Sequence, residues 1–591
     1  GGWYDKDDQL VPESEIFERY RDEVVARSGV RFFHDDGPLH DGHTPEAAVV
    51  FLDRDITFTV DDEAEARSYV DEDPQFSVAS QTAFGEWQVT RKAGAQVRVP
   101  RRATLNRRIG GLFPTDFDPA RWGVPASMLD SIDPIAVWNL VSAVDAFVSA
   151  GFSPAELLRF IHPADLACTQ GTGFGGMRSM HKLFVDRFLG EEYPQDILQE
   201  TLPNVVAAHT MQSYIGGYGS MINPVGACAT AAVSIEEGVD KIAAHKADFV
   251  VAGAIDDIQV ESIVGFGSMN ATANSQELLD RGISPRFVSR ANDRRRGGFV
   301  EAQGGGTVLL TRASVAVEMG LPVLAVVAHA QTFADGAHTS IPAPGLGALA
   351  VARGGASSPL ARSLAALGVG VDDVAFVSKH DTSTNANDPN ESDLHTRVGR
   401  ALGRSAGNPL LVVSQKTLTG HAKGGACVFQ VGGIIDAFRS GVIPANIALD
   451  CVDDKMEQYS PLVWLRSPLD LSARGPVRAA FATSLGFGHV SGFLALVHPG
   501  AFEAVVEREA GPEALARWRS ASDARLRAGS RHFEMGMLGH APLFEPVDAR
   551  RLPDDPALGA AGDPHEVEAQ MLLDPRARLG ADGYYHLPDQ Q

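Results

Sequence analysis

The chain has 591 residues and a formal net charge of −24, with 44% hydrophobic and 21% charged residues. These values exclude a mainly disordered chain and predict an ordinary globular protein with at least one large core. The acidity disfavours binding to nucleic acid or to anionic lipid. One basic stretch, "RVPRRATLNRR" at 98–108, departs from this trend, and we interpret it as a solvated loop that balances acidic neighbours.

Cysteine usage and targeting segments narrow the class of protein further. The four cysteines, Cys168, Cys228, Cys427 and Cys451, show no paired CxxC spacing. They are too few for a disulfide framework or a zinc ribbon. We find no apolar run of membrane-spanning length and no signal peptide, so we expect a cytoplasmic protein without a membrane or metal partner. The opening Gly1-Gly2-Trp3 lacks an initiator methionine, which favours a piece of a longer polypeptide.

The N-terminal region, residues 1–116, is acidic and irregular. Its short alternating apolar pieces, such as "AAVVFLDRDITFTV", predict strands, and we interpret the region as an accessory or linker segment. The composition then changes, and Ile135 to Phe147 form an apolar stretch at helical spacing. The main domain is therefore expected to begin at residue 117.

Residues 117–500 alternate short β-rich runs with helical segments, a pattern typical of an α/β protein with buried sheets. The runs include "ADFVVAGA", "GGTVLLT" and "LPVLAVVAHAQ". A strand–loop–helix plan then repeats, because "SMINPVGA" leads into a helix near Cys228 and "NPLLVVS" leads into "QKTLTGHAKGGACVFQVGGIIDAF". Two duplicated halves would allow loops from both to meet at one site.

Cys228 lies where an amphipathic helix is predicted to begin. Unpaired N–H groups and the helix dipole at that end favour a thiolate, which is the nucleophilic form of cysteine. The small neighbours Gly226, Ala227 and Ala229 leave room for a substrate. The alternative reading is a buried cysteine that acts as a small apolar residue.

Two histidines supply partners for this cysteine. His380 follows an apolar strand in "VAFVSKHDTSTNANDPNES", and His421 follows a glycine in "SQKTLTGHAKGGA". Each alone is compatible with a hydrogen-bonded structural histidine. Together with a cysteine at a helix start, they indicate a catalytic set.

After about residue 500 the chain becomes rich in Ala, Asp, Pro and Arg. We interpret residues 501–591 as a C-terminal extension, and "LPDDPALGAAGDPHE" within it as a flexible or surface-wrapping tail.

Several motifs in order resemble the β-ketoacyl synthase domain of the giant type I fatty acid synthases of fungi and actinobacteria. They are "DPARWGVP", "GTGFGGM", "DILQETLPN", "VGACATA", "GFVEAQGGG", "KHDTSTNANDPNES", "QKTLTGHAKGGA" and "SLGFGHVSG". The resemblance covers about Phe117 to Gly500. It implies a thiolase-like fold in which two pseudo-repeated halves form five layers, αβαβα.

The resemblance also implies roles for individual residues. Cys228 would accept the acyl chain from a carrier-protein thioester. His380 and His421 would promote loss of carbon dioxide from malonyl by donating hydrogen bonds to the enolate oxygen. Lys416 would orient this pair. The backbone N–H groups of Cys228 and Phe487 would form the oxyanion hole, and the Phe487 side chain would gate the acyl pocket.

Claisen condensation needs an acyl thioester on a nucleophile and a carbanion beside it, and decarboxylation supplies that carbanion without a strong base. A thiolase would need a second cysteine near "SLGFGHVSG", which has none. The Cys-His-His set resembles the elongating class. Two departures from the broader pattern are Asp381, directly after His380, and His489, where glycine is common.

Two further motifs allow two readings each. Gly171 to Gly176, "GTGFGG", satisfies the GxGxxG dinucleotide pattern, but no strand with a terminal acidic residue follows about 20 residues later. The resemblance places Phe174 in the acyl pocket, whereas a simple tight turn is the alternative.

"SRANDRRRGGF" at 289–299 has four arginines, which could bind a phosphopantetheine arm or an acidic carrier, or pair internally with carboxylates.

These observations predict a β-ketoacyl-acyl-carrier-protein synthase that joins an acyl group on Cys228 to malonyl on the carrier protein. The domain would bind no cofactor of its own, because its substrates arrive on the carrier's phosphopantetheine arm. The resemblance implies a homodimer within a larger fatty acid synthase. The alternatives are a non-catalytic ketosynthase-like scaffold, which usually lacks the nucleophile, and a nicotinamide-dependent oxidoreductase.

Overall fold

The computed structural model describes residues 3–5, 7, 9–33, 43–114, 117–187, 192–336, 345–546 and 564–586. The chain divides into two compact units, one formed by Phe33–Arg108 and the other by Gly1–Phe32 together with Ile109–Gln591. Within the described residues, none of the helices combines the length and apolar composition that crossing a bilayer needs.

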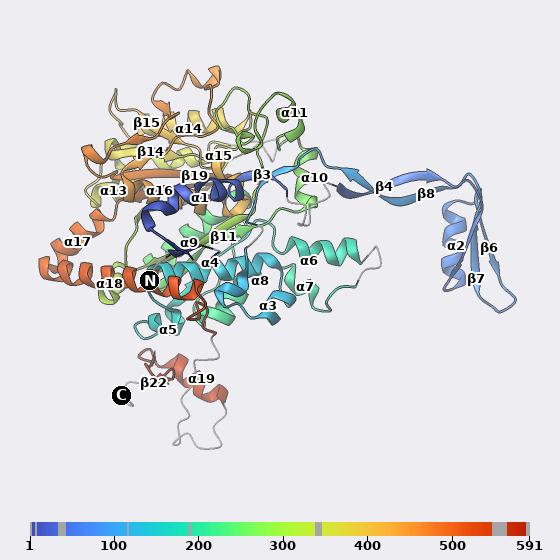
Figure 1. Ribbon diagram of the computed structural model, residues 1–591, viewed down its shortest axis with the longest axis horizontal. Helices are drawn as coiled ribbons and strands as arrows, with labels where there is room; N and C mark the ends of the chain where they lie inside the picture. The colour runs from blue at the N-terminus through green and yellow to red at the C-terminus, as the bar shows by residue number, and fades with distance from the viewer. Residues whose placement is uncertain are drawn as a thin grey trace. The chain divides into compact units, whose positions relative to one another are not determined.

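Two sheets organise the larger unit (Figure 1). The first has β10 (Leu166–Cys168) parallel to β11 (Phe249–Asp256), which pairs antiparallel with β12 (Gly304–Thr311). The second has the order β13 (Val326–Ala334), β20 (Val490–Val497), β19 (Ala479–Gly486), β14 (Val374–Ser378), β15 (Leu410–Val413) and β17 (Leu462–Trp464). β20 is antiparallel to both of its neighbours, and β19, β14, β15 and β17 run parallel.

Helices fill the space between the sheets and cover both outer faces. α9 (Thr230–Ala243) and α16 (Ala426–Ser440) lie between the sheets. Ile235 of α9 and Ile434 of α16 belong to one core cluster that also contains residues of both sheets. α4 (Pro134–Ala150) packs on the first sheet, and α13 (Pro359–Ala366) and α14 (Asn387–Ala401) pack on the second. The predicted five-layered αβαβα fold is confirmed, and so is the helix predicted at 135–147.

The predicted duplication is visible in backbone geometry as well as in strand order. Ala227 opens a 3-10 turn, Ala227–Ala229, immediately before α9, and Lys423 opens the turn Lys423–Gly425 immediately before α16. Their φ angles are 47° and 46°, although neither residue is glycine. This left-handed conformation is unusual for such residues. Its recurrence makes Cys228 and Gly424 equivalent positions in the two halves.

The smaller unit combines a two-stranded ribbon with a small three-stranded sheet. β4 (His43–Phe51) pairs with β8 (Gln96–Thr104), and β5 (Ile56–Val60), β7 (Trp87–Arg91) and β6 (Ser77–Gln81) form the sheet that α2 (Glu63–Glu72) covers. The strands predicted within residues 47–60 are therefore present. The loop predicted at 98–108 is wrong through Thr104, because the alternating "VRV" continues the ribbon.

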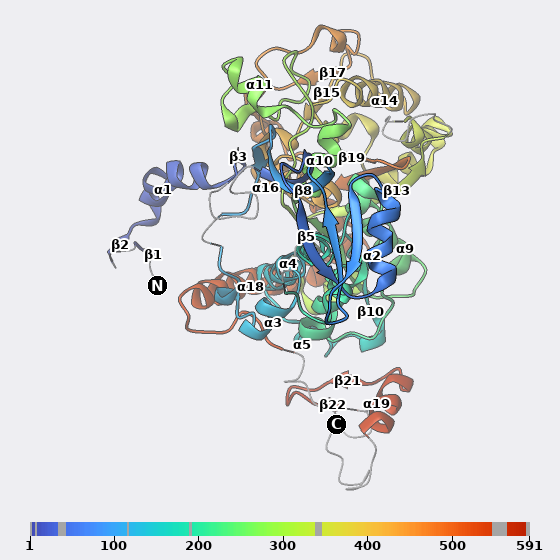
Figure 2. The ribbon, with the colours of Figure 1, turned by 90° about the vertical axis from the view of Figure 1, so that its right-hand side faces the viewer.

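The predicted C-terminal extension begins as packed helix. α17 (Gly500–Ala510) is followed by α18 (Pro512–Met537), which lies alongside α4 (Figures 1 and 2). Trp518 is buried against α17 and donates a hydrogen bond from its indole to the Leu321 carbonyl at 3.0 Å. A shorter helix, α19 (Pro564–Leu573), follows, and residues 547–563, which include most of the predicted tail, lie outside the described residues.

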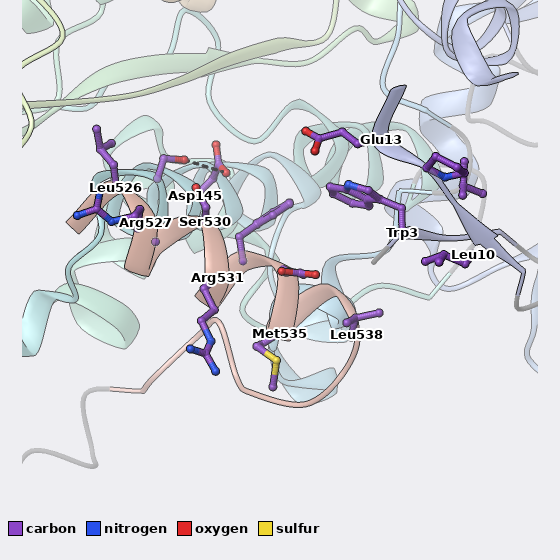
Figure 3. A pocket seen from close by; sticks show the side chains of 16 residues that line it. Trp3, Leu10, Glu13, Asp145, Leu526, Arg527, Ser530, Arg531, Met535 and Leu538 are labelled. Carbon is purple, nitrogen blue, oxygen red and sulfur yellow. Dashed lines mark hydrogen bonds between the residues drawn. The ribbon is translucent and has the colours of Figure 1, made fainter. Parts of the chain in front are cut away.

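A cavity of about 1400 Å³ lies between α18 and the N-terminal segment (Figure 3). Its lining includes Trp3 and Leu10 from strands β1 (Trp3–Tyr4) and β2 (Leu10–Val11), and Met535 from α18. Helix α1 (Glu13–Arg27), which follows β2, buries none of its residues. No residue of the predicted catalytic set lines this cavity, so its size gives it no role in the predicted chemistry.

The packing of the middle layer can be tested by truncating Ile235, which is 1% exposed. Ile235→Ala is expected to lower the free energy of unfolding by about 2–5 kcal/mol, because it leaves a cavity between two sheets. Ile447→Ala, at a position 42% exposed, should change it by less than about 0.5 kcal/mol. Urea unfolding measures both. Equal effects would mean that α9 is not packed as described.

Candidate active site

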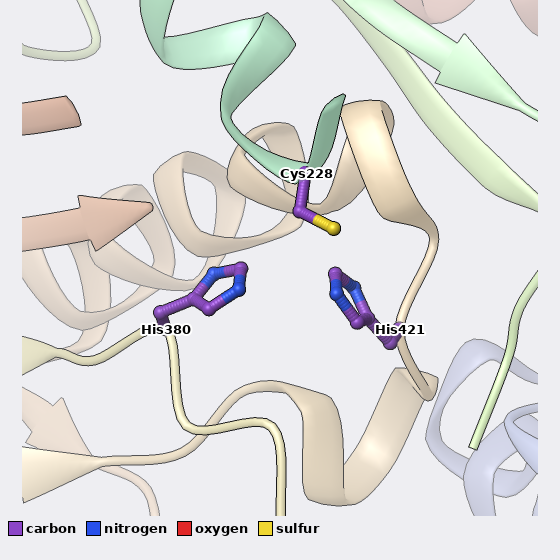
Figure 4. A group of neighbouring side chains, drawn as sticks. All are labelled: Cys228, His380 and His421. Carbon is purple, nitrogen blue, oxygen red and sulfur yellow. The ribbon is translucent and has the colours of Figure 1, made fainter. Parts of the chain in front are cut away.

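The structure brings Cys228, His380 and His421 together (Figure 4). Cys228 lies in the turn before α9, His380 lies two residues after β14, and His421 lies between the short helix α15 (Lys416–Thr419) and the turn before α16. One sulfur or ring nitrogen from each lies within 4.8 Å of the others. All three residues are buried, so the two halves do meet at one site.

Lys416 fixes the protonation pattern of His380. Its Nζ donates to the His380 backbone oxygen at 2.6 Å and lies 3.2 Å from His380 Nδ1. A lysine ammonium can only donate, so His380 Nδ1 is the acceptor. The ring proton of His380 is therefore on Nε2, where it is available as a hydrogen-bond donor.

Both histidines are neutral at physiological pH. Burial lowers the pKa of His380 well below its ordinary value, and the charge on Lys416 lowers it further. Burial, together with the charges of Lys416 and Lys423, does the same to the pKa of His421. A neutral imidazole with one N–H suits hydrogen-bond donation to a developing enolate oxygen better than strong-base catalysis.

The thiol of Cys228 differs from the expectation of a ready thiolate. Burial raises its pKa to about 11, against the opposing effects of Lys416, Lys423 and a hydrogen bond from the Phe487 backbone N–H. The expectation of a ready thiolate is wrong, because desolvation of the buried sulfur outweighs the contacts that lower the thiol pKa. The Cys228 side chain is therefore a thiol at neutral pH.

A buried carboxylate holds the backbone of His380. Glu391 on α14 accepts the N–H of His380 at 2.5 Å and that of Asp381 at 2.8 Å. Asp381 itself faces away from His380, because it pairs with Lys379 at 2.6 Å and accepts from Asn292 at 2.7 Å. The unusual carboxylate after His380 is thus part of the buried support. Sequence reasoning missed Glu391 and Asn292, although Glu391 lies in the quoted motif.

Aromatic side chains connect the site to the two predicted pocket residues. Phe266, on α10 (Val260–Ser268), contacts Phe174, Phe299 and Phe487, with ring centroids 6.0, 5.2 and 5.8 Å away, respectively. Phe299 in turn contacts His421 at 5.1 Å. The sequence reasoning missed Phe266 and Phe299, because their contacts join segments far apart in the chain.

The backbone N–H groups of the GxGxxG turn already bind a side chain of the protein itself. The backbone N–H groups of Gly173 and Phe174, which a dinucleotide phosphate would need, donate to Asp256 at 3.0 and 3.2 Å. This arrangement disfavours a nucleotide site at the turn.

The arginine-rich stretch pairs largely inward. Arg290 binds Asp293 at 3.2 Å, and Arg296 binds Asp453 at 2.6 Å, whereas the Arg294 side chain is exposed. Internal ion pairing therefore accounts for both buried arginines.

By spacing alone, Cys228, His380 and His421 could also hold a metal ion. Sulfur and two imidazoles are ligands that zinc accepts. However, the buried ammonium groups of Lys416 and Lys423 act on the histidines, and a dication would be repelled by both. The charges therefore fit a thiol nucleophile better than a metal centre.

Comparison with known families agrees with this geometry. Residues 77–316 match the "Beta-ketoacyl synthase, N-terminal domain" model, and residues 324–450 match the "Beta-ketoacyl synthase, C-terminal domain" model. The chain belongs to the β-ketoacyl synthase family. The predicted family and its class, condensing acyltransferases, are confirmed.

Curated relatives of this β-ketoacyl synthase are much longer proteins. Fatty acid synthase 2 of Mycosarcoma maydis is 32% identical over 99% of the chain, and fatty acid synthase subunit alpha of Saccharomyces cerevisiae is 29% identical over 98%. The chain spans only 15% and 35% of their respective lengths. The ketosynthase FabY of P. aeruginosa superposes with a TM-score of 0.79 at 22% identity, covering 92% of this chain and 83% of that one, which supports the fold.

The pKa of the Cys228 thiol predicts the pH dependence of its alkylation. Because only the thiolate reacts, the iodoacetamide rate should rise about tenfold per pH unit. The rise should continue until the pH approaches the thiol pKa of about 11. Peptide mass spectrometry of Cys228, with Cys228→Ser as the blank, measures it. A plateau below pH 9 would instead indicate a preformed thiolate.

Proposed function

We propose that this chain is a β-ketoacyl-acyl-carrier-protein synthase that performs decarboxylative Claisen condensation in fatty acid elongation. The observation that supports it most is a buried thiol beside two neutral histidines. A non-catalytic scaffold would have no need of this arrangement.

In the first half-reaction, the Cys228 sulfur attacks the acyl thioester on the carrier. The bond between the acyl carbon and the carrier sulfur breaks, and the proton that Cys228 loses ends on the departing carrier thiol. The backbone N–H groups of Cys228 and Phe487 stabilise the oxyanion. The hydrogen bond from Phe487 to the sulfur supports this placement.

In the second half-reaction, malonyl on the carrier loses carbon dioxide, and the electron pair of the broken bond forms a thioester enolate. His380 Nε2–H and His421 hold the enolate oxygen. The enolate carbon then attacks the acyl group on Cys228, and the bond to sulfur breaks. A 3-ketoacyl carrier leaves, and Cys228 regains a proton from water.

The acyl chain would extend along the aromatic cluster formed by Phe174, Phe266 and Phe487. Phe487 lies at the nucleophile and Phe174 is 39% exposed, so the cluster joins the sulfur to a solvent-accessible end. Phe487 is suited to act as the gate, because Gly488, with a φ of 85°, and His489, with a φ of 65°, directly follow it. The substrates bring their own phosphopantetheine arm, so the domain needs no resident cofactor.

We further propose that residues 117–500 form the condensing domain, with 1–116 as an accessory region and 501–591 as an extension. Every residue assigned a role above lies within 117–500. The names of the curated relatives support a place within a larger fatty acid synthase. The four cysteines are free, which supports a reducing, cytoplasmic setting.

A homodimer would pair through the edge of the first sheet. Met221 bridges to Cys168 on β10, so residues near 221 extend that edge. The same segment exposes apolar side chains, with Met221 at 39%, Ile222 at 40% and Val225 at 59%. Exposed apolar side chains beside an open sheet edge are typical of a protein interface.

Acylation and decarboxylation can be measured separately, which distinguishes the proposed roles of Cys228 and His421. With a labelled medium-chain acyl carrier and malonyl carrier, Cys228→Ala should accept no acyl group. His421→Ala should acylate at Cys228 but release carbon dioxide about 10²- to 10³-fold more slowly. Cys451→Ala, outside the site, should match the wild type. A folded wild-type protein that neither acylates nor decarboxylates would favour the scaffold.

The dimer can be tested at the same sheet edge. Ile222→Lys places a charge within the proposed interface and should shift the protein to a monomer in sedimentation velocity. Ile447→Lys, at a similarly exposed position, should leave the dimer intact. A wild type that is monomeric at micromolar concentration would contradict the proposal.

A further inference from the structure

Asp256 bridges two loops that reach the site from opposite halves. It is the last residue of β11, and it is completely buried. Its carboxylate accepts from the Thr172 hydroxyl at 2.8 Å and from the Gly173 and Phe174 N–H groups at 3.0 and 3.2 Å. The same carboxylate accepts from the Gly424 N–H at 2.6 Å. One side chain therefore joins the loop at 171–176 to the turn that follows His421.

Two glycines make this approach possible. A Cβ atom added to Gly173 or to Gly424 would lie 2.7 Å from Asp256 Oδ2. That is closer than real Cβ atoms come to oxygen, so each backbone can reach the carboxylate only as glycine. The bridge thus depends on three residues from three separate segments.

The charge of Asp256 does not serve to activate the nucleophile. It raises the pKa of the Cys228 thiol, whereas Lys416 and Lys423 lower that pKa. A buried carboxylate that opposes thiolate formation needs another reason to be there, and its hydrogen bonds supply one. All of its hydrogen-bond partners are donors, and three of them are backbone N–H groups that cannot reorient.

We propose that Asp256 is a positioning residue that holds the turn after His421 against the Phe174 loop, and so sets the place of the His421 ring. This inference rests on the proposed condensing function. His421 is three residues before Gly424, and its own backbone N–H bonds the Val300 carbonyl at 2.7 Å. The Ala302 N–H also bonds the His421 carbonyl at 3.0 Å, and Lys423 pairs with Glu301 at 3.1 Å. Loss of the Asp256 contact therefore releases the anchor at the Gly424 end of this short segment.

Asp256→Asn tests the proposal with almost no change in volume. The amide offers one acceptor oxygen and one NH₂ group. The NH₂ group must therefore face an N–H donor, either at Gly424 or in the Phe174 loop, and that hydrogen bond is lost. Acylation of Cys228 should stay within a few-fold of the wild type. Release of carbon dioxide from malonyl carrier should fall about 10- to 100-fold, because a displacement of about 1 Å is enough for such a loss.

Asp257→Asn is the matched control. Asp257 is also buried, but it binds Arg178 at 2.8 Å and Gln303 at 2.9 Å and not the His421 turn. Asp257→Asn should lower the rates of acylation and decarboxylation equally, or change neither rate. Gly424→Ala disturbs the bridge from its other end without altering charge, and it should reproduce the split between the half-reactions. It also keeps the test valid if Asp256→Asn does not fold.

The alkylation profile of Cys228 adds a readout that a loss of stability would not produce. Removing the Asp256 charge should move the profile to lower pH, and Gly424→Ala should not move it. Equal loss of both half-reactions in Asp256→Asn, or wild-type rates in folded Asp256→Asn and Gly424→Ala, would overturn the positioning role and leave the proposed function intact. A wild type inactive in both half-reactions would overturn the function itself.

Discussion

The buried ammonium of Lys416 is the constraint on which the chemistry of the site depends. It donates to the His380 carbonyl and to His380 Nδ1, which leaves the His380 proton on the nitrogen that lacks this contact. Burial lowers the pKa of Lys416, and the nearby charge of Glu391 opposes that effect. Glu391 also accepts the His380 backbone N–H. The same carboxylate therefore fixes the histidine's backbone and helps to keep charged the lysine that fixes its ring.

Burial leaves the three reactive side chains uncharged at neutral pH, although charges surround them. Desolvation acts in opposite directions on a thiol and an imidazole, raising one pKa and lowering the other, but in both cases it favours the neutral form. A site of this kind works by placing N–H donors where negative charge develops, not by holding a strong base. Such donors need no water reorganisation when the charge appears.

Local patterns placed Cys228 before a helix and His380 after a strand. The cysteine and the two histidines together indicated a catalytic set, and the resemblance to β-ketoacyl synthases gave each residue its role. The repeated strand–loop–helix plan predicted the two halves, whereas the five layers were implied by the resemblance to β-ketoacyl synthases. The thiol pKa, the contacts of Phe266 and the bridge of Asp256 could not be predicted from the sequence. Each of these depends on segments brought together by the tertiary fold, and none leaves a periodic pattern in the chain. The ribbon strand through Thr104 was missed because its arginines resembled a solvated loop.

The two halves share one backbone conformation, but the N–H group that it presents has a different role in each half. Ala227 and Lys423 share a left-handed conformation that starts each central turn, so the N–H groups of Cys228 and Gly424 are equivalent. In the second half, Asp256 takes that N–H as an internal anchor. In the first half, the equivalent position is Cys228, the proposed nucleophile, whose sulfur accepts a hydrogen bond from the Phe487 N–H. In one half this N–H binds the Asp256 carboxylate, which is always present in the fold. In the other half the same geometry suits an oxyanion that exists only during reaction.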